Sequence, residues 1–121
     1  MSALNAQEIR EISQGSTITW SAVFDELLDG QTIASCTLVE QVSGPGTLTI
    51  GTGTVNSSQA ITVGGVSHPV NTVIQFSVEA QTPSSNSDTT KALAGVYRID
   101  VWYTTSGGDV DVLRCWLKVS A

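Results

Sequence analysis

Apolar and polar residues alternate along several short stretches of this chain, and a period of two is typical of β-strands that bury one face. In residues 31–40, for example, Ala34, Cys36 and Leu38 fall on one face, which we expect to point inward. No stretch of useful length shows the 3.6-residue period of an amphipathic helix. The pattern predicts seven strands, at residues 17–24, 31–40, 47–50, 60–63, 72–80, 95–104 and 110–119.

Turn residues separate these strands, and residues 81–91 form a longer polar loop with no strand pattern. Short strands at such spacing are typical of a Greek-key sandwich. Tyr97 precedes Ile99 as the tyrosine of a tyrosine corner precedes the buried position of the sixth strand, so it should bond back to the preceding loop. We therefore predict an all-β, immunoglobulin-like Greek-key β-sandwich of about seven strands, formed by residues 15–121.

The first 14 residues are polar and weakly patterned, and we interpret residues 1–14 as a short N-terminal arm. The arm carries Leu4, Ile9 and Ile12, which are too few to bury a core of their own. Such residues suit an extended segment that lies along the exposed strand edge of a neighbour. We expect the arm to be disordered in the free protein and ordered on a partner, with Leu4 and Ile9 in the interface.

The last two strands predict a hairpin with one inward and one outward face. Alternation points Val101 and Cys115 inward, and pairing them gives the three-residue loop Gly107–Asp109. The outward pairs are then Trp102 with Arg114, Asp100 with Trp116, and Arg98 with Lys118.

Tryptophan and arginine are enriched among interface hot spots, so this face is a candidate docking patch. The alternative is that the N-terminal arm or the loop at residues 81–91 folds over it. The candidate interface residues on the hairpin are Arg98, Trp102, Arg114 and Trp116.

The net charge of the chain limits the classes of molecule that we expect it to bind. The chain has a net charge of −6 and only five basic residues. An acidic surface repels phosphate, which argues against nucleic-acid binding and against an anionic membrane surface. The N-terminus has no basic and apolar signal-peptide pattern, and no apolar run approaches the roughly 20 residues of a membrane-spanning helix. We expect the chain to fold in the cytoplasm of the cell that makes it.

The candidate chemistry is sparse, and the sequence argues against an enzyme. His68 is the only histidine, so it would be the only possible base for a Ser-His-Asp or Cys-His arrangement. Cys36 and Cys115 are interpreted as buried, reduced thiols, and a disulfide between them is the alternative. Carboxylates gather at the turns around residues 25–29 and 109–111 without the spacing of a calcium loop, so we expect no metal and no cofactor.

Two segments carry a resemblance to a known family. The first is Ile18-Thr-Trp-Ser, followed after an acidic turn by Leu28-Asp-Gly-Gln-Thr-Ile33-Ala-Ser. The second is Gly95-Val-Tyr-Arg-Ile-Asp-Val-Trp-Tyr-Thr-Thr-Ser-Gly-Gly108, followed by Leu113-Arg-Cys-Trp-Leu-Lys-Val119. Together they resemble the opening and the closing hairpin of the small fibre–tail adaptor domains of tailed bacteriophages. The segment from Gly44 to Pro69 departs from that pattern.

The resemblance implies a structural virion protein, an adaptor that docks tail or neck to fibres by protein–protein contacts in several copies per particle. It also implies that the chain is present in the host cytoplasm during assembly. A capsid decoration protein and a carbohydrate- or receptor-binding module of a fibre are the alternative functions, because the same architecture serves them. Copy number per particle separates the first two, and sugar binding in isolation identifies the third.

Overall fold

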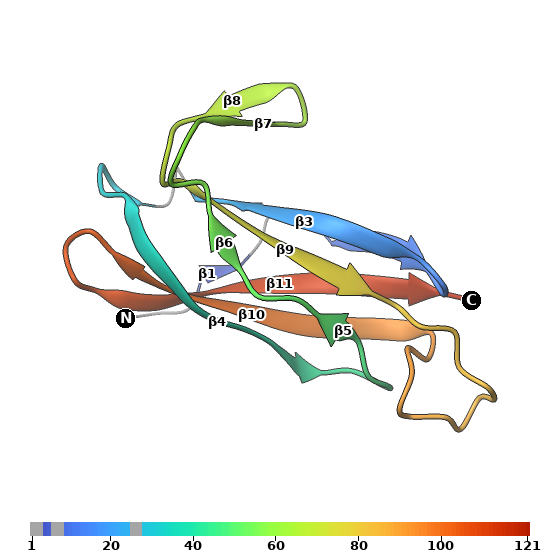
Figure 1. Cartoon of the computed structure of the whole chain (residues 1–121). Helices are drawn as coiled ribbons and strands as arrows, with labels where there is room; N and C mark the ends of the chain where they lie inside the picture. The colour runs from blue at the N-terminus through green and yellow to red at the C-terminus, as the bar shows by residue number, and fades with distance from the viewer. Residues whose placement is uncertain (1–3, 6–8, 25–27) are drawn as a thin grey trace.

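Two β-sheets pack face to face in this protein, and a separate two-stranded hairpin stands beside them (Figure 1). The computed structural model describes residues 4–5, 9–24 and 28–121, and all regular structure within these residues is β-strand. The first sheet has the order β1-β11-β10-β4, and β2 also pairs with β11. Its strands are β1 (Leu4–Asn5), β2 (Arg10–Ser13), β4 (Ile33–Ser43), β10 (Gly95–Thr105) and β11 (Val110–Ser120).

The second sheet is built around one central strand. That strand, β9, pairs along one edge with β3 and along the other edge with two short segments, β5 and β6. The remaining hairpin joins β7 to β8 and lies between β6 and β9 in the chain. The bounds are β3 (Thr17–Val23), β5 (Thr49–Ile50), β6 (Thr54–Val55), β7 (Ile61–Val63), β8 (Val66–His68) and β9 (Val73–Glu79).

The core lies between the inner faces of the two sheets, where alternate residues of facing strands meet. Trp20 of β3 stacks on Phe76 of β9 with ring centroids 5.7 Å apart. Phe24 meets Tyr103 of β10 edge-on at 4.7 Å, so this contact joins the two sheets. The all-β, immunoglobulin-like sandwich predicted from the sequence is confirmed.

The tyrosine corner expected from the sequence is present. The side chain of Tyr97 is fully buried, and its hydroxyl donates a hydrogen bond to the carbonyl oxygen of Leu93 at 2.6 Å. Because Leu93 belongs to the loop before β10, this bond attaches the loop to the core at the point where the strand begins.

The predicted inward face of residues 31–40 is wrong in part. Ala34 is exposed and Leu38 is 48% exposed, whereas Ile33 is buried. The pairing of β4 with β10 shifts register three times, and each shift marks a bulge or irregularity. A bulge inserts one extra residue, so the residues beyond it change face and simple alternation fails. Cys36 and Val39 pack against the core as a result.

Residues 10–14 of the predicted N-terminal arm lie along this chain's own first sheet. Strand β2 runs parallel to the end of β11, with Ile12 aligned with Val119, and Ile12 is only 8% exposed. The backbone N–H of Gln14 donates to Ser120 O at 2.8 Å. The free edge of β11 needs hydrogen-bond partners, and this chain's own residues supply them. A four-residue strand is too short to be recognised from periodicity.

Candidate docking face

The hairpin of β10 and β11 has a different register from the one predicted. Val101 is aligned with Leu113 and Ile99 with Cys115, a shift of two residues from the predicted pairs. The turn is closed by the N–H of Thr105, which donates to Asp109 O at 2.8 Å, so the three-residue loop is Ser106–Gly108.

Glycine placement explains this shift. Three-residue hairpin loops commonly end in a residue with positive φ. In the observed loop that residue is Gly108, with φ of 89°, whereas the predicted loop would have placed Asp109 there. Glycine adopts this conformation without steric cost, so the observed register is favoured.

A shift of two residues preserves the faces of both strands, because side chains alternate with a period of two. All four predicted hairpin residues therefore lie on the outer face of the first sheet, and each is partly exposed. Their neighbours differ from those predicted, since Asp100 rather than Trp102 is aligned with Arg114. We define the outer face by Leu38, Glu40, Arg98, Asp100, Trp102, Arg114 and Trp116.

Ionic contacts organise the centre of the outer face. The guanidinium of Arg98 donates from Nε and Nη2 to the two carboxylate oxygens of Asp100, both at 3.0 Å. Asp100 is only 3% exposed, so burial of its charge is compensated by this bidentate pair. The same bond raises the pKa of Arg98.

Trp102 is held in place by the neighbouring strand. Its indole Nε1 donates to Glu40 Oε1 at 3.2 Å, and Leu38 is aligned with it on β4. Neither Trp102 nor Trp116 belongs to the hydrophobic core. The predicted pairing of Trp102 with Arg114 is not seen, because Trp102 is aligned with Val112. Within the described residues, the cation–π contact is instead that of Arg10 over Trp20, at 5.5 Å.

Arg114 and the two N-terminal candidates complete the predicted set. Arg114 Nε is buried and has no hydrogen-bond partner among the described residues. Ile9 is 60% exposed and precedes β2, which follows the edge of β11 beside Trp116. Leu4 lies in β1, aligned with Leu113, and its side chain falls outside the described part of the structure.

The cysteines are separate and free. Cys115 is fully buried and Cys36 is half-buried, so the predicted burial holds fully for Cys115 only, and no disulfide joins them. Burial raises the pKa of Cys36, and burial together with the charge of Asp100 raises the pKa of Cys115 to about 12. Both thiols are therefore protonated near neutral pH, and neither is activated as a nucleophile.

The lone histidine and the acidic turns form no metal-binding group within the described residues. His68 lies on β8, away from the strands that carry the two cysteines. Across the described ranges, no three of the histidine, cysteine, aspartate and glutamate side chains are grouped so that they could hold a metal ion. The acidic turn at residues 25–29 falls partly outside those ranges.

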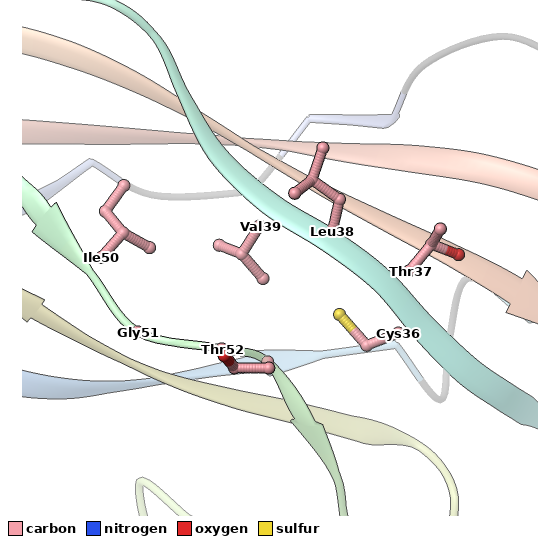
Figure 2. A pocket seen from close by; sticks show the side chains of 8 residues that line it. Cys36, Thr37, Leu38, Val39, Ile50, Gly51 and Thr52 are labelled. Atoms are coloured by element: carbon pink, nitrogen blue, oxygen red, sulfur yellow. The ribbon is translucent and has the colours of Figure 1, made fainter.

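A groove that the sequence analysis missed opens between the edge strands of the two sheets (Figure 2). It has a volume of about 270 Å³, and the thiol of Cys36 points into it. On the side of the second sheet, the groove is bounded by the segment between β5 and β6. Gly51 and Gly53 of this segment have no side chain that would fill the groove. The only sequence signal was the Gly51-Thr-Gly53 interruption. The groove is lined by Cys36, Thr37, Leu38, Val39, Ile50, Gly51, Thr52 and Gly53.

Comparison with known proteins returned no match, whether with family models, curated proteins or solved structures. Within the described residues, no helix is long and apolar enough to cross a membrane.

Proposed function

We propose that this chain is a structural protein of a bacteriophage virion, an adaptor that joins tail or neck to fibres and docks through the outer face. The observation that carries the docking role is a pair of partly exposed tryptophans, Trp102 and Trp116, outside the core of the sandwich. The virion assignment is supported by the resemblance of the opening segment and the closing hairpin to fibre–tail adaptor domains.

The geometry of Trp102 supports a pre-organised anchor. Because its indole already bonds to Glu40, little side-chain freedom is lost when a partner packs against it. The Arg98–Asp100 pair beside it presents a guanidinium whose orientation is also fixed. Rigid aromatic and arginine side chains surrounded by polar neighbours are typical of interface hot spots.

The test replaces Trp102 and Trp116 separately with alanine. Loss of a hot-spot tryptophan costs about 2 kcal/mol or more of binding free energy, which weakens binding about 30-fold. The folding cost should be near 1 kcal/mol, since neither side chain is in the core. Each variant is measured for its melting temperature and for incorporation into purified particles by quantitative mass spectrometry.

Trp20→Ala is the matched control, because Trp20 is 4% exposed and stacked in the core. It should destabilise the isolated domain by about 3–5 kcal/mol. Normal incorporation of both outer-face variants would refute the docking role. A copy number that follows the capsid lattice would favour a decoration protein, and sugar binding by the isolated chain would favour a carbohydrate-binding module.

A further inference from the structure

The charges of the outer face cancel one another. Its two arginines are matched in number by two carboxylates, Asp100 and Glu40, so the net charge of −6 is carried entirely by the rest of the chain. On the same side of the first sheet, Lys118 is aligned with Glu11 of β2, and this pair adds no net charge either. A negatively charged group is therefore repelled less by the outer face than by the other surfaces of the protein.

Both carboxylates of the outer face are already engaged within the chain. Asp100 is buried and accepts two hydrogen bonds from Arg98, both at 3.0 Å. Glu40 Oε1 accepts the indole N–H of Trp102 at 3.2 Å. The first arginine of the face is thus neutralised by Asp100, and Glu40 holds a tryptophan rather than the second arginine.

That second arginine, Arg114, has no partner among the described residues. The backbone pairing aligns it with Asp100, yet the structure records no hydrogen bond or ion pair between Arg114 and any described residue. Its Nε is buried and unpaired, whereas neither Nη group is among the buried unpaired atoms, so the end of the guanidinium is accessible. Polar groups at a buried position are normally paired, so this guanidinium favours a partner from outside the chain.

Two tryptophans flank this guanidinium. Trp116 follows Arg114 by two residues on β11, and Trp102 is aligned with Val112, which precedes Arg114 by two residues. Because residues two apart on a strand share a face, the tryptophans lie on opposite sides of Arg114 along the strands. A partner that covers both indoles excludes water from the guanidinium between them, and a charge pair is strongest where water is excluded.

We propose that the partner of the outer face places an Asp or Glu side chain on Arg114, whose two Nη groups donate to the carboxylate between Trp102 and Trp116. The parallel N–H groups of a guanidinium match the two oxygens of a planar carboxylate. A single carboxylate in an apolar protein surface fits better than a polyanion, which would also meet the −6 of the remaining chain. This inference rests on the proposed function, because it uses the same face and adds the chemistry of the partner.

The first experiment compares Arg114→Gln with the wild type during assembly. The two chains are mixed in excess over their binding sites, and their ratio in purified particles is measured by quantitative mass spectrometry. Loss of one member of a desolvated charge pair should leave Arg114→Gln under-represented about 30-fold or more. Its melting temperature should stay close to that of the wild type, since the guanidinium makes no bond to a described residue.

Lys118→Gln is the matched control. Lys118 is exposed on the same strand, and its replacement removes the same charge. It should compete equally with the wild type. Equal competition by Arg114→Gln, or an equal loss in both variants, would overturn the proposal, because the first outcome shows no pairing and the second reports only net charge.

The second experiment detects the carboxylate directly with a water-soluble carbodiimide, which condenses a carboxylate with a lysine amine that touches it but does not react with arginine. Particles assembled with Arg114→Lys alone keep the positive charge. They should give a cross-link from the substituted side chain to an Asp or Glu of another virion protein, and wild-type particles should give none from this peptide. Incorporation without such a cross-link, or complete loss of incorporation by Arg114→Lys, would each overturn the carboxylate pairing.

The two tryptophan variants separate failure of this inference from failure of the docking role. If Trp102→Ala and Trp116→Ala reduce incorporation and Arg114→Gln does not, only the carboxylate pairing is refuted. If the tryptophan variants incorporate normally, the outer face is not the docking surface, and both proposals fail.

Discussion

Replacing Tyr97 with phenylalanine removes one oxygen atom from the core and leaves the ring in place. The hydroxyl donates to Leu93 O at 2.6 Å, so its loss leaves that carbonyl group without this partner. Tyr97 itself is fully buried, so water cannot easily replace the missing atom. Leaving buried polar groups unpaired costs about 1–3 kcal/mol.

The size of this effect can be expressed as a melting temperature. Unfolding entropy is about 2.1 cal/mol/K per residue, or roughly 250 cal/mol/K for a chain of 121 residues. A loss of about 1–3 kcal/mol therefore lowers Tm by about 4–12 °C. Thermal unfolding followed by circular dichroism at neutral pH measures it directly.

Tyr103→Phe is the control for that experiment. Tyr103 is 2% exposed and lies on the same face of β10, but the structure records no hydrogen bond to its hydroxyl from any described residue. Its replacement should lower the free energy of unfolding less than Tyr97→Phe does, because no hydrogen bond to a described residue is lost. If Tyr97→Phe lowers Tm no more than Tyr103→Phe does, the hydroxyl does not stabilise the corner, and the argument from buried hydrogen bonding fails.

The polar loop at residues 81–91 and the thiols supply two further predictions. The carboxylate of Asp88 accepts hydrogen bonds from Thr90 and Ser84, which lower its pKa to about 2. The stabilisation of this loop is therefore complete above the ordinary pKa of 3.8 and disappears as pH falls through about 2, and an NMR titration midpoint near 3.8 would contradict it. At pH 9 a small thiol reagent should modify Cys36 slowly and leave Cys115 unmodified until the protein is unfolded, so rapid native modification of Cys115 would show that its strand opens.

The faces of β10 and β11 could be predicted from the sequence because they depend only on a period of two. Alternation correctly separates Val101 and Cys115 from Trp102 and Trp116, even though the predicted pairing between the strands is off by two residues. A shift of two residues leaves the hydrophobic pattern unchanged. The pattern therefore contains no information that distinguishes the two registers. The register that forms is the one that places Gly108 at the positive-φ position of the turn.

The edge of the first sheet shows the opposite case, where local pattern misleads. Bulges in β4 turn Leu38 outward and leave Cys36 against the core. No residue type in that segment predicts these bulges. Bulges arise from the fit between one strand and its neighbour, which a single segment does not reveal. The same reasoning applies to β2, whose four residues became a strand because β11 offered a free edge.

The sequence by itself determined the all-β class, the buried faces of β10 and β11 and the tyrosine corner, since these follow from alternation and from one tyrosine beside a loop. Tertiary structure determined which residues and strands are neighbours in space. It brought Glu40 to Trp102 across 62 positions of the chain, and it set the β4 edge against the β5–β6 segment to form the groove. Such contacts depend on which strands become neighbours, and strand neighbours are chosen by the packing of the whole core rather than by any one segment.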